Sequence, residues 1–481
     1  MRLGEILVAR GLVTVEGIDA ALLRQRVEGG RLGENLIALG QLTAAELIAA
    51  MRGAPLTPSA AAETGIAPRN LLELMLKFMH IEACETAMEL SERMKLPRRI
   101  VQQILDEASH QRFVQALGAV PGSAFNIRYG ISEAGRAAAR EALEQSMYIG
   151  PAPVALQDYQ DQLQRQRISN EQLALDDLRR GFEGLVVPEH YLRKLLPAVN
   201  TGRSVLMFGP AGNGKTTLAT RIGGLFKDIV YIPYAVEVAG QIVKVFDPAL
   251  HQTSLSEAAA AVMAGGAFEA EDYDHRWMPC RRPLAAAGGE LTLEMLDLQH
   301  NSDTRFYDAP LHVKAFNGMF LIDDFGRQKF KPNDLLNRWI VPMESQVDYL
   351  RLASGATFQL PFDLLLIFST NLQPSDLMDA AFLRRIQYKI KLFAPTLAEY
   401  RQIFDAAARR YGLTLTDEVF DYVAGRLKDR FGFAYYQPRF ICDQVLEACK
   451  CFNLPPQMTR ELVGEALSNL YFDIDDPPDG A

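Results

Sequence analysis

The middle of the chain alternates between short apolar runs and stretches in which apolar residues recur every three to four positions. Runs of this length, bounded by turn residues, predict buried strands, and their alternation with helical stretches predicts an α/β sheet over residues 180–395. A further segment, YLRLASGATFQLP (349–361), alternates around Ser354 and Gly355 and predicts a β-hairpin. The apolar runs are SVLMF (204–208), DIVYIPY (228–234), MFLI (319–322), LLLIF (364–368) and YKIKLF (388–393).

The segments on either side of this sheet are mainly helical in pattern. Residues 71–147 contain three helical stretches, the third reaching Leu117, followed by a short strand and another helix. This order resembles a winged helix. An extended, proline-containing arm with a polar helix follows over residues 148–179. The remaining parts are a Pro/Ala/Thr linker at 55–70, a helical lid at 396–470 and an acidic tail at 471–481.

Two segments near the N-terminus repeat each other. RLGEILVARG (2–11) is followed 29 residues later by RLGENLIALG (31–40). In each copy a short helix leads to a glycine turn, and then Thr14 or Thr43 is placed to cap a second helix. Two helix pairs are too few for a solenoid, which needs at least about three repeats. The pattern therefore predicts one pseudo-symmetric, all-α unit over residues 1–54.

Length and composition indicate a multidomain globular protein. At 481 residues the chain is too long for one hydrophobic core, and at roughly 150 residues per domain about three domains are expected. Its 48% hydrophobic and 23% charged residues are ordinary for a globular protein. No apolar run approaches the roughly 20 residues that span a bilayer. We therefore expect a cytoplasmic protein without membrane insertion, and the net charge of −9 argues against a general coat for nucleic acid.

One motif predicts a phosphate site. FGPAGNGKTT (208–217) fits the pattern G-x-x-x-x-G-K-[ST], follows a predicted strand and opens a predicted helix. The glycines let backbone N–H groups face phosphate oxygens, Lys215 would neutralise the β- and γ-phosphates, and Thr216 would ligate Mg²⁺. The predicted ATP-binding residues are Gly209, Pro210, Ala211, Gly212, Asn213, Gly214, Lys215, Thr216 and Thr217.

A second motif supplies acidic residues for the same chemistry. The run GMFLIDDFGRQ (318–328) leads an apolar strand directly into two aspartates, as a Walker B strand does. Asp323 is expected to hold Mg²⁺ through water, and Asp324 to polarise the attacking water. A surface acidic turn is the alternative interpretation.

Together these motifs resemble those of the AAA+ ATPases, and the match continues in the family's order over residues 180–470. The strand ending in STN resembles sensor 1, which implies that Asn371 orients the water or the γ-phosphate. The segment DAAFLRRIQ resembles the one that carries the arginine finger toward a neighbouring subunit, with Arg385 as first choice and Arg384 as second. The segment YYQPRFICDQ resembles the sensor 2 helix and implies that Arg439 contacts the nucleotide.

Three features distinguish this chain within the family that it resembles. The family usually has Glu at the position of Asp324, which is one methylene shorter, so the water sits closer or hydrolysis is slow. The hairpin at 349–361 resembles the pre-sensor hairpin branch, which includes MoxR-like chaperones. The long stretch at 240–316 exceeds what the core needs between strands. Its Phe306 and Tyr307 are either pore residues or buried anchors.

The N-terminal repeat resembles the MshE-type domain of type II secretion and type IV pilus ATPases, with two RLG blocks separated by the five-residue spacer RVEGG (26–30). That domain binds cyclic di-GMP, and arginine can bond bidentately to guanine O6 and N7. The second block has Ala54 where the first has Gln25. A four-helix adaptor that binds no nucleotide remains the alternative. The implied contacts are Arg2, Leu3, Gly4, Gln25, Arg31, Leu32 and Gly33.

The preferred hypothesis is a cyclic di-GMP-responsive AAA+ ATPase that hydrolyses ATP with Mg²⁺ as a homo-oligomeric ring, a hexamer, and remodels a protein partner. A DNA-acting AAA+ regulator and a nucleotide-insensitive scaffold are the alternatives. Residues 71–143 carry nine basic and nine acidic side chains. Because a neutral module favours protein contact, DNA is not the expected partner.

Overall fold

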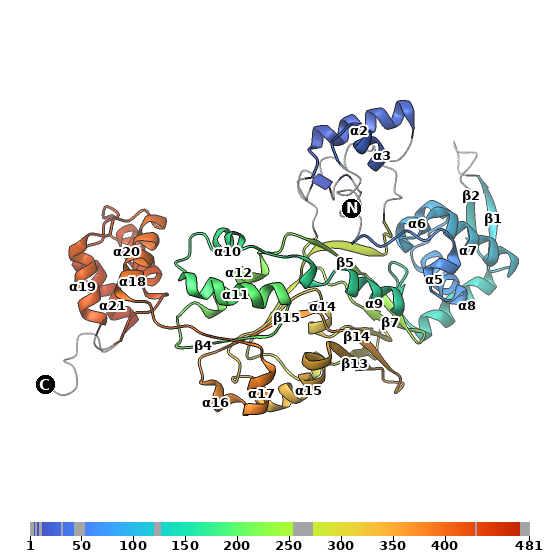
Figure 1. Ribbon diagram of the computed structural model, residues 1–481. Coiled ribbons are helices and arrows are strands. Elements are labelled where there is room, and N and C mark those ends of the chain that lie inside the picture. The colour runs from blue at the N-terminus through green and yellow to red at the C-terminus, as the bar shows by residue number, and fades with distance from the viewer. Residues whose placement is uncertain are drawn as a thin grey trace.

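The computed structural model describes residues 4, 7–8, 12–29, 32–42, 53–119, 127–253, 273–428 and 431–471. In Figure 1 the central sheet and its helices occupy the middle, the helices α18–α21 lie at one end, and a helical module with strands β1 and β2 lies at the other. Within the ranges given, no helix combines the length and apolarity needed to cross a membrane.

The central sheet has five parallel strands in the order β16-β4-β15-β12-β9, which confirms the predicted α/β sheet. Alternate residues point to opposite faces. Val205 packs with the helices α11 and α12, whereas Leu206 shares a core with Trp339 of α15. The strands are β4 (Val205–Phe208), β9 (Leu284–Ala287), β12 (Gly318–Ile322), β15 (Leu364–Thr370) and β16 (Tyr388–Lys391); the helices are α10 (Leu175–Gly181), α11 (Glu189–Thr201), α12 (Lys215–Gly223), α14 (Leu311–Lys314), α15 (Pro332–Ser345), α16 (Pro374–Leu377) and α17 (Ala380–Arg385).

One predicted strand lies outside the central sheet. The run at 228–234 forms β5 (Ile229–Pro233), which pairs antiparallel with β8 (Trp277–Arg281) instead of joining the parallel strands. The edge position belongs to β9, which follows β8 after two residues. Its sequence Leu-Ala-Ala-Ala lacks the β-branched and aromatic residues typical of strands, so the hydrophobic pattern did not reveal it.

The stretch 240–316 builds most of a second sheet, ordered β10-β11-β7-β6-β3. Its strand β3 comes from the predicted arm, and Tyr159 and Leu163 of the following helix α9 are buried in the central core. The arm is therefore part of the folded body. The elements are β3 (Val154–Ala155), α9 (Leu156–Arg165), β6 (Ala235–Val238), β7 (Gln241–Lys244), β10 (Gln299–Asn301) and β11 (Phe306–Asp308).

Residues 68–145 supply most of a second hydrophobic core, which Tyr148 and Ala152 of the following segment and Ala235 of β6 complete. The third helix ends at His110 and not at Leu117, because Arg112 turns the chain with a positive φ of 61° and residues 114–119 enter a strand. That strand, β1, pairs antiparallel with β2, giving helices followed by a two-stranded antiparallel sheet. The elements are α5 (Pro68–Ile81), α6 (Ala87–Met94), α7 (Arg98–His110), β1 (Val114–Ala119), β2 (Ile127–Ile131) and α8 (Glu133–Gln145).

The predicted hairpin is present as β13 (Val347–Arg351) paired with β14 (Thr357–Pro361). Tyr307 is 3% exposed, and its hydroxyl accepts a hydrogen bond from the Ala353 N–H at 2.9 Å. The ring of Phe306 packs edge-on against Tyr148, with 5.8 Å between centroids. Both aromatics are thus anchors that join the second sheet to its neighbours.

The segment after α3 is bonded to the folded body. Gln162 donates to the Gly53 carbonyl at 2.5 Å, and the Asp274 N–H donates to the Pro55 carbonyl at 3.0 Å. Arg276 and Asp274 form an ion pair whose side chains are 3% exposed. The same arginine donates to the Thr64 carbonyl at 3.0 Å. Residues 53–64 therefore lie against the body, although the sequence predicted a linker.

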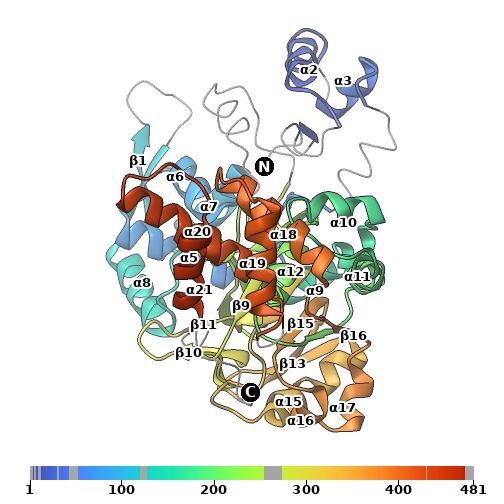
Figure 2. The ribbon, with the colours of Figure 1, turned by 90° about the vertical axis from the view of Figure 1, so that its left-hand side faces the viewer.

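The two ends of the chain contribute small helical cores. Thr14 caps α2 (Val15–Glu28) as predicted, accepting from the Gly17 N–H at 3.2 Å, and α3 (Leu32–Ala38) packs against it. Thr43 lies outside the described residues. At the other end, the helices of the predicted lid, called the lid below, pack around one core, and Figure 2 shows them in front of α12; they are α18 (Leu397–Arg410), α19 (Asp417–Leu427), α20 (Gln437–Cys451) and α21 (Arg460–Leu470).

Candidate functional site

The glycine-rich loop joins the end of β4 to the start of α12. Its backbone takes conformations open to glycine, with φ of 145° at Gly209, 76° at Gly212 and 75° at Gly214. A Cβ added to Gly209 would lie 2.2 Å from the Leu392 carbonyl oxygen. The loop is therefore shaped by the strand β16 beside it as well as by its own turns.

The side chain of Lys215 makes three hydrogen bonds within the site. Its Nζ donates to the carbonyls of Gly209 and Pro210 at 2.9 Å each and to Asn371 Oδ1 at 2.5 Å. Only 6% of the residue is exposed. Burial lowers the pKa of Lys215, and the charges of Asp323 and Asp324 oppose that shift.

Thr216 and Asp323 form an all-oxygen pair at the mouth of the loop. The hydroxyl of Thr216 donates to Asp323 Oδ2 at 2.8 Å. Hydroxyl and carboxylate oxygens are the protein ligands that Mg²⁺ prefers. The pair therefore fits a magnesium site of the kind predicted from the sequence.

The second acid is held by the neighbouring strand. Asn371 follows β15, and its Nδ2 donates to Asp324 Oδ1 at 3.2 Å while its Oδ1 accepts from Lys215. Asp324 itself has a φ of 48°, in the left-handed region that non-glycine residues rarely adopt. Such strain persists where surrounding contacts enforce it and is common at functional sites.

Sequence reasoning missed the residue that holds the loop after β12. Gln328 is 9% exposed and donates to the carbonyls of Asp323 at 3.0 Å and Gly288 at 3.2 Å. Its own amide oxygen accepts from the Gly326 N–H at 2.9 Å. No motif points to a glutamine here, because its role depends on β9 lying beside β12.

The side chains of Lys215, Thr216, Asp323, Asp324 and Asn371 line one cavity of about 480 Å³ between the sheet and the lid. Asn213 also lines it, and its buried Nδ2 has no hydrogen-bond partner among the described residues. An orphaned donor in a glycine-rich loop fits a bound anion. Further lining residues come from the segment before α11, from the first turn of α11 and from the lid: Val186, Val187, Pro188, Tyr191, Ile403, Arg410, Tyr435, Tyr436 and Arg439.

The predicted finger arginines, Arg384 and Arg385, lie on α17 and do not line this cavity. Arg385 is bonded to Glu344 at 2.5 Å and lies over the ring of Phe382. Arg384 is exposed. Of the two, Arg384 is therefore the one whose guanidinium faces solvent.

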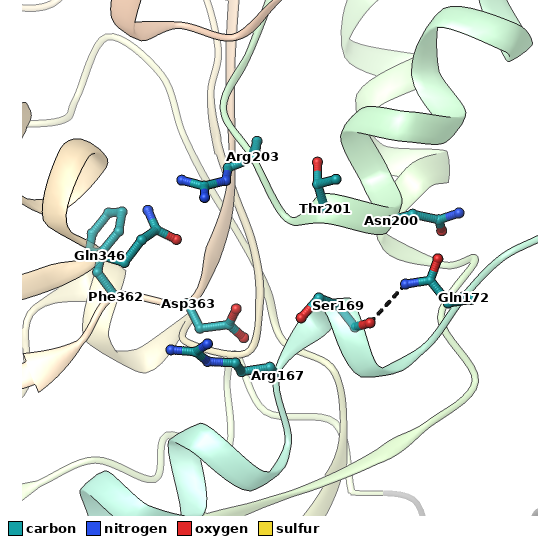
Figure 3. A pocket seen from close by; sticks show the side chains of 9 residues that line it. All are labelled: Arg167, Ser169, Gln172, Asn200, Thr201, Arg203, Gln346, Phe362 and Asp363. Atoms are coloured by element: carbon teal, nitrogen blue, oxygen red, sulfur yellow. Dashed lines mark hydrogen bonds between the residues drawn. The ribbon is translucent and has the colours of Figure 1, made fainter.

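A second cavity, of about 380 Å³, lies where β4 and β15 begin, at the opposite edge of the central sheet (Figure 3). Asp363 Oδ2 accepts there from the Ile168 N–H and from Asn317, at 2.9 and 2.7 Å, and burial raises the pKa of this carboxyl. Figure 3 shows Arg167 beside Asp363. Every residue predicted to bind ATP lies elsewhere. The other lining residues are Ser169, Gln172, Asn200, Thr201, Arg203, Gln346 and Phe362.

The residues predicted to bind cyclic di-GMP are only partly visible. Arg2, Leu3 and Arg31 lie outside the described residues. A Cβ added to Gly4 would meet side-chain atoms of Ile18 and Leu32 at 3.3 and 3.4 Å. Leu32 is 7% exposed and Gly33 is buried, whereas Gln25 is half-buried on α2.

The family profile that matches this chain covers the lid and no other part. A family profile described as a domain of unknown function (DUF8689) matches residues 396–469, the lid helices. No curated protein matches the chain.

Solved structures similar to this chain share low identity with it. NtrX from Brucella abortus is 12% identical, with a TM-score of 0.36 over 62% of this chain and 55% of its own, so the match spans little more than half of NtrX. The Holliday junction branch migration motor RuvB of Thermotoga maritima is 14% identical, with a TM-score of 0.32 over 68% and 74% of the two chains. Domain III of the replication initiation protein DnaA from Thermotoga maritima is 16% identical, with a TM-score of 0.33 over 62% and 97%.

The arrangement of the site on the central sheet defines the class of fold without these comparisons. A parallel sheet carries a glycine-rich loop at the end of β4, acidic residues at the end of β12 and an amide at the end of β15, beneath a helical lid. This is a P-loop α/β fold, in agreement with the core implied by the sequence resemblance.

Proposed function

We propose that the chain is an ATPase of the AAA+ class. The observation that carries the proposal is the convergence of three strand ends on one cavity. Lys215 lies 2.5 Å from Asn371, and Thr216 lies 2.8 Å from Asp323. Arg439 lines the same cavity from the lid.

Each side chain has a place in phosphoryl transfer. Lys215 and the loop N–H groups bind the β- and γ-phosphates, and Thr216 and Asp323 hold Mg²⁺. When bound, Mg²⁺ neutralises charge on the phosphate oxygens. Asp324 accepts a proton from the attacking water, and Asn371 fixes the orientation of that carboxylate.

Steady-state ATP hydrolysis with Mg²⁺ tests this assignment. Lys215→Ala is expected to lose ATP affinity, and Asp324→Asn to retain ATP but lose turnover by at least about a hundredfold. Chelation of Mg²⁺ should abolish hydrolysis in the wild-type protein. Phe452→Ala, at a 69% exposed lid position, is the control. Unchanged hydrolysis in both site variants would refute the proposal, and a wild-type protein without activity would support the scaffold alternative.

The working form is a homo-oligomeric ring, a hexamer, in which α17 of one subunit meets the nucleotide of the next. Arg384 is the better-placed finger, since Arg385 is bonded to Glu344. Arg384→Ala should bind ATP but hydrolyse it poorly. Mixing it with Asp324→Asn should restore some activity at hybrid interfaces, and light scattering should give the subunit number. Loss of activity only in Arg385→Ala would reverse the choice.

Cyclic di-GMP is the effector in this proposal, and the partner remodelled is a protein. Support comes from the two RLG blocks, and from residues 53–64, which connect the repeat directly to the body through Gln162, Asp274 and Arg276. Calorimetric titration of the full chain should give heat with cyclic di-GMP. Arg2→Ala or Arg31→Ala should weaken binding by roughly ten- to a hundredfold. No measurable heat with cyclic di-GMP would favour the four-helix adaptor that binds no nucleotide, and equal affinity for cyclic di-AMP would refute guanine recognition by Arg2 and Arg31.

The DNA-acting alternative is less well supported by the helical module. On α7, Arg99 donates to the Pro58 carbonyl at 3.1 Å and Gln103 accepts from the Ala61 N–H at 3.3 Å. The segment 58–61 therefore covers part of the helix that would enter a groove. Salt-dependent binding of a fluorescent duplex by the full chain would restore this alternative.

A further inference from the structure

A tyrosine that no motif identified lies at the junction of lid and loop. Tyr436 is the residue before α20, and Arg439 follows three positions later. Residues three apart near a helix start lie on neighbouring positions of one face. Both side chains line the cavity that also contains Lys215. The start of α20 thus presents an aromatic ring and a guanidinium to the same space.

The ring of Tyr436 lies directly on the glycine-rich loop. A Cβ added to Gly212 would be 2.3 Å from Cδ1 and 2.6 Å from Cε1 of Tyr436. Real Cβ atoms essentially never approach a neighbour so closely. The ring of Tyr436 can therefore pack against the loop only because Gly212 has no side chain.

Tyr436 contacts Tyr471, the residue that follows α21. Its hydroxyl lies 3.3 Å from that of Tyr471, which also accepts from Gln437 at 2.8 Å. Tyr471 stacks on Phe431 with 3.9 Å between ring centroids. Gln437 is fully buried and binds the Gly432 carbonyl at 3.0 Å. The turn that carries Tyr436 is therefore fixed inside the lid.

The chemistry of this contact suits a mechanical role. Burial, together with the hydrogen bond to Tyr471, raises the pKa of Tyr436 to about 12. The phenol thus stays neutral at the pH at which an ATPase works, and it brings no charge to the phosphates. Its ring supplies a rigid apolar face, which costs little side-chain entropy to place.

We propose that Tyr436 is a positioning residue of the nucleotide site. Its ring seats the lid on the loop at Gly212 and thereby sets the distance from Arg439 to the phosphates held by Lys215. The proposal rests on the ATPase function proposed above. It adds that Gly212 is a glycine because of the lid as well as because of its own φ of 76°.

The test measures kcat and KM for ATP in the full chain. Tyr436→Ala should lower kcat by between about ten- and a hundredfold, because a misplaced group loses catalysis without losing its charge. Tyr436→Phe keeps the ring and should stay within about twofold of wild type, with Tyr471→Phe close to it. The control Phe452→Ala lies about 24 Å along the same helix at 1.5 Å per residue and should not change kcat.

A double-mutant cycle isolates the contact itself. Gly212→Ala adds the methyl group that meets the ring, so it should lower kcat, and the loss should not add to that of Tyr436→Ala in the double variant. If the two losses simply multiply, the ring and the loop do not act through each other, and the proposal is overturned.

Two outcomes separate this inference from the proposed function. If Lys215→Ala abolishes hydrolysis while Tyr436→Ala retains wild-type kcat, only the role of Tyr436 is refuted. If hydrolysis survives Lys215→Ala, the ATP site is wrong and the role of Tyr436 falls with it. Should Tyr436→Ala fail to fold, Tyr436→Leu, which removes the ring but keeps an apolar side chain, takes its place in the cycle with Gly212→Ala, and the same test of additivity decides.

Discussion

Asn371 is the side chain on which the candidate site can be tested most sharply. It is the only described residue bonded to both Lys215 and Asp324, at 2.5 and 3.2 Å. The amide does two different things, accepting from the lysine and donating to the carboxylate. Replacing it with alanine or with aspartate removes these bonds differently, so the two variants should behave differently.

The expected size of each effect follows from the geometry. Hydrogen bonds to charged groups contribute about 1.5–3 kcal/mol, and because Asn371 is only half-buried the lower end applies. About 1.4 kcal/mol corresponds to tenfold in rate, so Asn371→Ala should lower kcat about tenfold.

Asn371→Asp places a second carboxylate where the amide donated to Asp324. At 3.2 Å and an effective dielectric constant of about 20, the repulsion has an upper bound of about 5 kcal/mol. Solvent around the exposed Asp324 and the ammonium of Lys215, which lies 2.5 Å from the other oxygen of residue 371, reduce this repulsion, and a proton shared by the two carboxylates relieves the rest in acid. The protonated carboxyl then donates as the amide did.

The assay is kcat at saturating ATP from neutral toward acid pH, expressed as variant over wild type, since a carboxylate pair takes up a shared proton on the acid side. The ratio for Asn371→Asp should rise as the pH falls, because acid restores the missing donor, whereas the ratio for Asn371→Ala should stay flat. Parallel profiles for the two variants would show that Asn371 does not donate to Asp324 during the proposed reaction.

Three further predictions concern structure. Gly209→Ala should abolish nucleotide binding, measured by fluorescence titration, because its Cβ would lie 2.2 Å from the rigid Leu392 carbonyl. Asp348→Ala should destabilise the protein by about 3 kcal/mol in thermal melts, since it leaves the buried His312 and the half-buried Arg338 without their shared carboxylate. Arg276→Ala should cost a similar 3–5 kcal/mol or so by stranding Asp274, and removing both partners should cost less; equal losses would contradict the ion-pair explanation.

The central residues of the site could be predicted because they lie within short sequence motifs. A loop that wraps a phosphate needs glycines, a lysine and a hydroxyl at fixed spacing, so Lys215 and Thr216 could be placed from a few residues. Asp323 could be placed in the same way, from an apolar strand that runs into acids. Asn371 is 156 residues from Lys215, and only the order of motifs in a resembling family pointed to it.

The parts that were missed depend on contacts between distant segments. Strand β9 is a run of alanines whose place at the sheet edge is set by the pairing of β5 with β8. Gln328 acts only because β9 brings the Gly288 carbonyl within reach. The sequence pattern extended the third helix of residues 71–147 to Leu117, but α7 ends at His110. It ends there because Arg112 adopts a positive φ, which no residue pattern in that stretch indicates.

Gly212 shows why a correct local prediction can still be incomplete. Its φ of 76° explains a glycine from the loop alone, and on that ground a residue tolerant of the left-handed region, such as asparagine, would be acceptable. The ring of Tyr436, 224 positions away in the chain, occupies the space that any Cβ would need. Gly212→Asn should therefore fail in the wild-type background even though its backbone conformation is accessible. Partial recovery of kcat when Tyr436 is changed to alanine in the same chain would show that the lid, and not the turn, imposes the glycine, whereas no recovery would assign the requirement to the loop.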